Sequence, residues 1–254
     1  MKKFILYFIL LVFTFKSSMA QQNPDTTVFP VNKAYAIDSV PHLYKTKLLP
    51  SMIIPGALIV YGLTSLKNGG LYSSYKAQSD IHRAFGNAGS SVDNYLQFSP
   101  YVEFGALLLL KVKCKNDALN TALLVVKSET VMLAIVFPLK YITKVERPDS
   151  SNAQSFPSGH TAEAFLAATI VYREYRYKSS WYGIGAYTLA TTVAAYRMIN
   201  NKHWESDVIV GAGVGMLSAN LVYATHLHRW GRKEVCMIPT YDGTNKGFMM
   251  LYTL

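Results

Sequence analysis

Two basic residues precede a proline in the segment Lys140-Tyr-Ile-Thr-Lys-Val-Glu-Arg147-Pro148. Lys140 and Arg147 are seven positions apart, about two turns if the apolar helix before them continues, so both could approach one anion from the same side. Arg147 would offer a planar fork of N–H donors to phosphate oxygens, and Lys140 a compact positive charge. Taken alone, such a pair is more often two long side chains that reach from a membrane edge to water.

A second segment, Phe156-Pro157-Ser158-Gly159-His160-Thr161, opens an apolar run. Ser158 is a favourable helix N-cap residue, which would place Gly159 and His160 in the first turn of a helix. The unpaired backbone N–H groups and the dipole at a helix start attract anions, and a glycine lets the backbone come close to the ligand. The simpler interpretation is a capped helix whose first turn happens to contain a histidine.

A third segment, from Arg197 to Asp207, precedes another apolar run. His203 and Asp207 are four positions apart, a spacing at which two side chains touch on one face of a helix. A carboxylate bonded to one imidazole nitrogen fixes the tautomer and leaves the other nitrogen as a nucleophile. By itself, however, a pair at this spacing is usually a surface interaction.

Apolar segments long enough for helices could position these groups. They cover residues 49–66, 98–113, 118–140, 159–175, 182–199 and 207–226. Several approach the length of about 20 residues that a membrane span needs. Small residues are frequent in the last three, and Gly211, Gly213 and Gly215 favour close packing between helices. We therefore expect an all-α fold, a membrane-embedded bundle of about six helices.

The two ends of the chain differ from this helical part in composition. Residues 1–20 show the charged, apolar and small-residue order of a secretory signal peptide, with a retained membrane anchor as the alternative. Residues 21–48 are polar and predict an exported N-terminal arm. Residues 49–232 would then form the single helical domain, followed by a tail, 233–254, that resembles two short strands around an Asp-Gly turn.

The chain is basic, with a formal net charge of +10, and removal of residues 1–20 would lower this charge to +7. A positive balance suits anionic lipid headgroups or phosphorylated substrates, and export makes nucleic acid the least suitable partner. Lysines and arginines that flank membrane helices account for most of the excess. Cys114 and Cys236 lack the spacing of a zinc site and are expected to be free thiols, with a disulfide as the alternative.

Together, the three segments resemble the motifs KxxxxxxRP, PSGH and SRxxxxxHxxxD of the type 2 phosphatidic acid phosphatase (PAP2) family, which vanadium haloperoxidases and bacterial class A acid phosphatases share. The resemblance covers roughly residues 95 to 226. The matching positions are Lys140, Arg147, Pro148, Pro157, Ser158, Gly159, His160, Arg197, His203 and Asp207. Tyr196 stands where the third motif usually has Ser, and the connection between the first two motifs is short. The signal-like start, this tight connection and the strand-like tail are similar to those of lipid A phosphatases.

The resemblance implies a metal-independent phosphatase that acts on a lipid phosphate monoester or pyrophosphate: lipid A, undecaprenyl pyrophosphate or a phosphatidyl phosphate. His203 would form a phosphohistidine, Asp207 would orient it, and His160 would protonate the leaving oxygen. The phosphate oxygens would be held by Lys140, Arg147, Ser158, Gly159 and Arg197. Neither a metal nor any other cofactor is implied.

Loop charges indicate the side of the membrane on which this chemistry would occur. Basic clusters at 111–115, 173–178 and 229–233 fall on one side of the alternating helices, and the motif loops 141–158 and 197–206 fall on the other. We therefore expect a bacterial inner-membrane protein whose site faces the periplasm. Six crossings after a cleaved signal peptide contradict this orientation, so either the N-terminal segment is retained or one apolar segment does not cross.

Three alternatives stay open on the sequence alone. A secreted, soluble acid phosphatase of low selectivity would share the same motifs, and so would a haloperoxidase. A membrane protein that binds lipid phosphate without turnover belongs to a different class, and the presence of both histidines argues against it.

Overall fold

The computed structural model describes residues 48–67, 69–86, 89–226, 235–241 and 246–252. The predicted signal peptide and nearly all of the predicted N-terminal arm lie outside these residues. The helices are α2 (Leu48–Thr64), α3 (Ser74–Phe85), α4 (Asp93–Leu96), α5 (Ser99–Leu109), α6 (Ala118–Thr143), α7 (Gly159–Tyr175), α8 (Ser180–Ile199) and α9 (Glu205–Thr225). The described chain therefore confirms the expected all-α bundle, since each of the six apolar segments contains a helix.

Two helices, α3 and α4, do not follow from apolar patterning. The α3 sequence SYKAQSDIHRAF is polar, and its start is fixed by the Ser73 side chain, which accepts a hydrogen bond from the backbone N–H of Lys76. The α4 helix has only four residues. Its position becomes important at the site described below.

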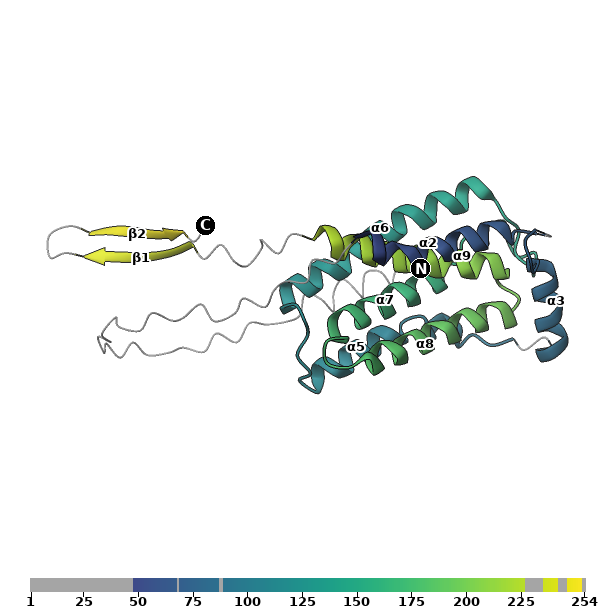
Figure 1. Cartoon of the computed structure of the whole chain (residues 1–254), viewed down its shortest axis with the longest axis horizontal. Coiled ribbons are helices and arrows are strands. Elements are labelled where there is room, and N and C mark those ends of the chain that lie inside the picture. Colours follow the sequence, from purple (N-terminus) through teal and green to yellow (C-terminus); the bar gives the residue numbers. More distant parts are fainter. Residues whose placement is uncertain (1–47, 68, 87–88, 227–234, 242–245, 253–254) are drawn as a thin grey trace. The chain divides into compact units, whose positions relative to one another are not determined.

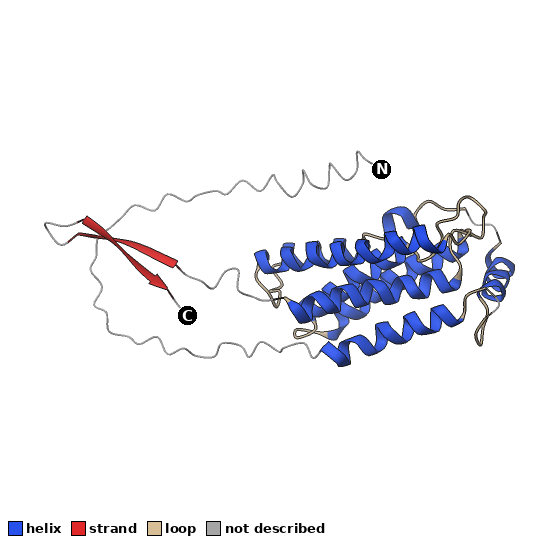
Figure 2. Ribbon diagram, turned by 90° about the horizontal axis from the view of Figure 1, so that it is seen from above, coloured by secondary structure: helices blue, strands red, loops and turns tan. Residues whose placement is uncertain are grey.

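The long helices run side by side along one axis, as Figures 1 and 2 show. The α9 helix packs against α2, α6 and α7, and α7 packs also against α5 and α8. At one end of the bundle, α3 lies across the other helices (Figure 1). There the side-chain amide of Gln78 donates to the carbonyl oxygen of Met198 at 3.1 Å, and the N–H of Ser206 donates to the Ser74 hydroxyl at 3.1 Å.

Glycines allow α7 and α9 to approach backbone to backbone. A Cβ atom added at Gly211 would stand 2.6 Å from the carbonyl oxygen of Ser158, and one added at Gly215 would stand 2.1 Å from that of Ala162. Both distances are far below van der Waals contact, so only glycine fits at these two positions. The close helix packing that the sequence indicates for this glycine series is confirmed.

A β-hairpin follows the helices in the chain. Strands β1 (Val235–Tyr241) and β2 (Lys246–Tyr252) pair antiparallel, with Val235 opposite Tyr252 and Tyr241 opposite Lys246. In the helical part, Cys114 is a free thiol whose sulfur lies 3.2 Å from the Tyr175 hydroxyl oxygen.

Among the described helices, α6 and α9 are long and apolar enough to cross a membrane. Of an apolar stretch of 18 residues in each helix, 67% is buried in α9, as in the central helix of a bundle, and 22% is buried in α6. Large apolar side chains of α6 are accordingly exposed, namely Val126, Leu133, Phe137, Tyr141 and Ile142. The α6 helix therefore carries a wide apolar surface that the rest of the described chain does not cover.

Gly215→Ala should destabilise the bundle, because the added Cβ would overlap the Ala162 carbonyl oxygen and push α7 away from α9. Overpacking of this kind costs about 1–3 kcal/mol, which corresponds to a fall in Tm of roughly 5 °C for a domain of this size. Thermal unfolding of the detergent-purified protein measures this fall in Tm. Gly105→Ala in α5 is the matched control, since nothing lies within 4 Å of its added carbon and alanine favours a helix. Equal Tm values for the two variants would contradict the close contact.

Candidate active site

The three motif segments meet at one end of the bundle, where α6 and α8 end and α7 and α9 begin. The backbone N–H of Ser158 donates to the carbonyl oxygen of Asp207 at 2.9 Å, which joins the second motif to the third. The Lys140 ammonium donates to the carbonyl oxygens of Gln154 at 2.8 Å and Ser155 at 3.3 Å, which joins the first motif to the loop before the second. Hydrogen bonds between positions 14, 15 and 49 residues apart thus hold the three segments together.

His203 lies in the loop just before α9, and its Nδ1 faces two partners. Asp207 Oδ2 is 3.4 Å from Nδ1, and the Ser155 hydroxyl oxygen is 3.3 Å from it. The Ser155 hydroxyl also donates to Asp207 Oδ2, and the backbone N–H of Trp204 donates to the same oxygen at 2.9 Å. This arrangement fixes the ring with Nδ1 toward the carboxylate, so Nε2 is left on the opposite side of the ring.

The His203 imidazole is 1% exposed. Burial holds its pKa well below the usual value, and the positive charges of Arg197, Lys140 and Arg147 lower the pKa further. The ring is therefore neutral near pH 7 and keeps the lone pair that a nucleophile needs.

The two cations of the first motif reach the site in a way that differs from the expected one. The α6 helix ends at Thr143, and Lys144 adopts a left-handed conformation with φ 47°. Arg147 therefore lies in a loop, where its Nε donates to Asn152 Oδ1 at 3.0 Å. The expected spacing of two helical turns is wrong, because the residue before a proline disfavours helix. Both cations nevertheless act electrostatically on His203.

Ser158 is the N-cap residue of α7, as expected, but its side chain does not cap the helix. The Ser158 hydroxyl instead accepts a hydrogen bond from the Thr161 hydroxyl at 3.0 Å. Gly159 begins the helix beside Lys140, whose Cε would be 3.9 Å from an added Cβ. The first turn of α7 therefore keeps backbone N–H donors that no capping side chain occupies, next to an ammonium group.

Arg197 and His160 are both held by α4. The Arg197 side chain is buried, and its Nη1 forms an ion pair with Asp93 Oδ2 at 2.5 Å. Its Nε is a buried donor without a partner in the described part of the chain. His160 Nε2 lies 3.1 Å from Asn94 Oδ1. A buried N–H group without an acceptor destabilises the fold by about 1–3 kcal/mol. The N–H of Arg197 Nε is therefore a candidate donor to a bound anion.

The loops that carry the site are tied together at its rim. The Lys202 ammonium and Asp149 Oδ2 are 2.6 Å apart, which joins the loop after Arg147 to the loop before His203. Burial alone would raise the pKa of Asp149, but hydrogen bonds from Lys202 and Ser151 outweigh burial and lower the pKa to about 2. The Asp149 carboxyl group is therefore ionised near pH 7.

Three residues of the site were not predicted from the sequence. Ser155 lies two positions before the second motif, and its type alone gives no sign that it contacts both His203 and Asp207. Asp93 and Asn94 lie about 100 residues before Arg197 in a polar stretch without a motif. All eight predicted site residues, by contrast, belong to the segments that meet at this end.

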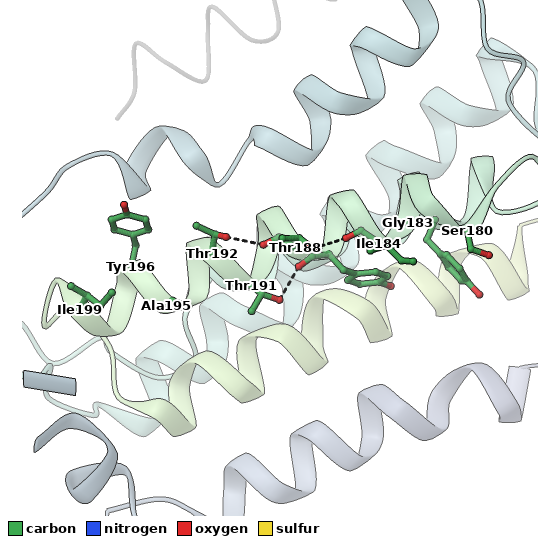
Figure 3. A pocket seen from close by; sticks show the side chains of 11 residues that line it. Ser180, Gly183, Ile184, Thr188, Thr191, Thr192, Ala195, Tyr196 and Ile199 are labelled. Atoms are coloured by element: carbon green, nitrogen blue, oxygen red, sulfur yellow. Dashed lines mark hydrogen bonds between the residues drawn. The ribbon is translucent and has the colours of Figure 1, made fainter. Parts of the chain in front are cut away.

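An apolar groove of about 830 Å³ lies elsewhere, along the outer face of α8 from Ser180 to Ile199 (Figure 3). Thr188, Thr191 and Thr192 line it, and each hydroxyl donates to the carbonyl oxygen four residues earlier. Their polar atoms are thus satisfied within the helix. None of the predicted site residues lines the groove, so it is separate from the cationic site.

A comparison with protein families gives a match over the part of the chain that holds the site. Residues 121–230 match the profile of the PAP2 superfamily, and all eight predicted site residues fall within this match. This matched part of the chain is called the PAP2 segment below. The PAP2 segment comprises α6 to α9 and excludes α2 to α5.

One individual protein and one solved structure are also similar to this chain. A lipid A 1-phosphatase of Porphyromonas gingivalis is 44% identical over 108 residues, which are 42% of this chain and 22% of that protein. The match thus spans about a fifth of the relative's length. Among solved structures, a crystal structure of Aquifex aeolicus LpxE aligns with 62% of this chain and 97% of its own, with a TM-score of 0.44 and 20% identity.

Ser155→Ala should lower turnover without unfolding the PAP2 segment, because it removes one hydrogen bond to the Asp207 carboxylate and one contact to His203. A hydrogen bond to a charged group contributes about 1.5–3 kcal/mol, so kcat should fall roughly 10- to 100-fold. Steady-state hydrolysis of a lipid phosphate measures kcat, and Ser151→Ala, an exposed serine of the same loop, is the control. Unchanged kcat in Ser155→Ala would show that this hydroxyl does not hold the His203–Asp207 pair.

Proposed function

We propose that this chain is a lipid phosphatase that hydrolyses a phosphate monoester or pyrophosphate through a phosphohistidine on His203. The observation that carries the proposal is the neutral imidazole of His203, anchored at Nδ1 by Asp207 and Ser155 and surrounded by the charges of Lys140, Arg147 and Arg197. A fixed nucleophile amid positive donors is what phosphoryl transfer requires, since its catalysis is mostly positioning and charge stabilisation.

In the first step, His203 Nε2 attacks phosphorus while the bond from phosphorus to the leaving oxygen breaks. In the anion-free site, burial and the charge of Arg197 lower the pKa of His160 to about 3, and a bound phosphate dianion would raise that pKa again. His160, protonated in the complex, gives its proton to the leaving oxygen, so the lipid leaves as a neutral alcohol or as a shorter phosphate. Asp207 stabilises the positive charge on the phosphorylated imidazole. The non-bridging oxygens are held by the Arg197 Nε, by Lys140 and Arg147, and by the N–H groups at Ser158 and Gly159.

In the second step, water attacks phosphorus and the bond from phosphorus to Nε2 breaks. His160, now neutral, takes a proton from the water, so inorganic phosphate leaves and both histidines return to their starting forms. The side chains of Lys140, Arg147 and His160 are partly exposed, so a substrate could reach them from the surface. His203 is buried, which would limit the access of bulk water to the intermediate.

A lipid substrate is supported by the surface of the bundle. Exposed apolar side chains cover α6 and continue on α2 and α5, where they include Ile53, Ile54, Val102 and Leu109. Apolar surface of this extent marks contact with a membrane or a partner, and a span-length helix such as α6 favours the membrane. The name of the P. gingivalis relative points to lipid A as the first candidate substrate. Undecaprenyl pyrophosphate and phosphatidyl phosphates are the other candidates.

The proposed location is the bacterial inner membrane, with the site open to the periplasm. The motif loops 141–158 and 197–206 meet at one end of the bundle, and the basic clusters at 111–115 and 173–178 lie at the ends of the same helices away from those loops. This distribution agrees with the excess of lysine and arginine in cytoplasmic loops.

His203→Ala should abolish hydrolysis of lipid A, phosphatidate and undecaprenyl pyrophosphate, measured as released phosphate, and should also abolish acid-labile incorporation of ³²P into the protein. His82→Ala on α3 is the control, because this histidine lies outside the three motifs. Phosphate release by a folded His203→Ala variant would refute the assignment of the nucleophile. A parent protein that binds these lipids but releases no phosphate from any of them would support a binding protein instead.

Turnover should persist in excess EDTA and should be inhibited by vanadate. Lys140, Arg147 and Arg197 supply the positive charge that a metal would otherwise provide, and vanadate adopts the five-coordinate geometry of the reacting phosphorus. The assay is phosphate release before and after chelation. Loss of activity in EDTA and its return with added Mg²⁺ or Zn²⁺ would disprove metal independence.

A further inference from the structure

The short helix α4 contacts two groups of the site although it lies outside the PAP2 segment. Asp93 is 2% exposed and pairs with Arg197, and the next residue, Asn94, contacts His160. Two adjacent residues of a four-residue helix thus reach both a phosphate-binding cation and the proposed proton donor.

The position of α4 is fixed by more than the ion pair. The backbone N–H of Ser90 donates to Asn200 Oδ1 at 3.0 Å, and the Asn200 side-chain amide donates back to the Ser90 carbonyl oxygen at 2.7 Å. Asn200 directly follows α8, three residues after Arg197. The segment before Asn94 is therefore held to the end of α8 by two hydrogen bonds and by a buried ion pair.

The contact between Asn94 and His160 has a defined direction. An amide oxygen only accepts hydrogen bonds, so its bond to His160 Nε2 requires a proton on that nitrogen. The bond fixes the orientation of the ring with Nε2 toward Asn94. It leaves Nδ1 as the nitrogen that can take up a second proton and transfer it.

We propose that Asn94 is a positioning residue that orients His160 for proton transfer to the leaving oxygen. The proposal rests on the proposed phosphatase function. Asn94 acts through His160 and does not touch the phosphate, so its effect depends on how much the leaving oxygen needs a proton.

Two water-soluble probes separate this role from a purely structural one. The leaving group of p-nitrophenyl phosphate departs as a stable anion and needs little protonation, whereas that of an alkyl phosphate such as hexyl phosphate needs a proton. His160 is also the proposed base of the second step, which is the same for both probes, so the rate to compare is that of phosphohistidine formation in a single turnover. General acid catalysis contributes roughly 10²- to 10⁴-fold, so Asn94→Ala should lower this rate for the alkyl phosphate at least about tenfold. For p-nitrophenyl phosphate the same rate should change less than about threefold.

Two further variants complete the test. Asn94→Asp keeps an oxygen acceptor at the same position and should restore most of the activity on the alkyl phosphate. Tyr95→Phe alters the neighbouring, exposed side chain and should leave both rates at the parent level. Circular dichroism and Tm measured on each variant verify that it is folded.

The results distinguish the two hypotheses. A parent protein that hydrolyses neither probe nor any lipid phosphate would refute the proposed function itself. A parent that hydrolyses both probes, with Asn94→Ala lowering the two rates equally or lowering neither, would overturn the role of Asn94 and leave the phosphatase intact.

Discussion

One backbone hydrogen bond joins the second motif to the third: the N–H of Ser158 donates to the carbonyl oxygen of Asp207. It links the start of α7 to the first turn of α9, so the proposed anion-binding residues at one helix start lie beside the His203–Asp207 pair at the other. Gly211 makes this bond possible, because any side chain at that position would collide with the Ser158 carbonyl group. The chemistry therefore depends on two helices whose backbones touch.

The second constraint is charge. Lys140, Arg147 and Arg197 would repel one another in a site without an anion, and burial increases that cost. Hydrogen-bond and ion-pair partners offset this repulsion: carbonyl oxygens for Lys140, Asn152 for Arg147 and Asp93 for Arg197. These partners do not use every N–H donor of the three cations. The Arg197 Nε has no such partner among the described residues. An anion such as a phosphate dianion would complete this charge balance.

The sequence predicts those parts of the molecule that depend on local patterns. Apolar runs gave the six long helices, and the motif spacing gave the eight site residues that meet at one end of the bundle. The position expected for Arg147, two helical turns from Lys140, was wrong because α6 ends at Thr143 and the left-handed Lys144 follows it. Ser155, Asp93 and Asn94 could not be predicted, because their roles arise from tertiary contacts, and a four-residue helix 100 positions from Arg197 has no periodic signal.

The glycine contact between α7 and α9 has a consequence for the proposed placement of the bundle in a lipid bilayer. Membranes differ in thickness by several ångströms, and helices respond to the mismatch by tilting or by sliding past one another. Carbonyl groups seated against Gly211 and Gly215 prevent α7 from sliding along α9. In a membrane, adjustment to bilayer thickness would therefore fall to the outer helices α2, α5 and α6, and the separation of the His160 and His203 imidazoles would not depend on the thickness of that membrane.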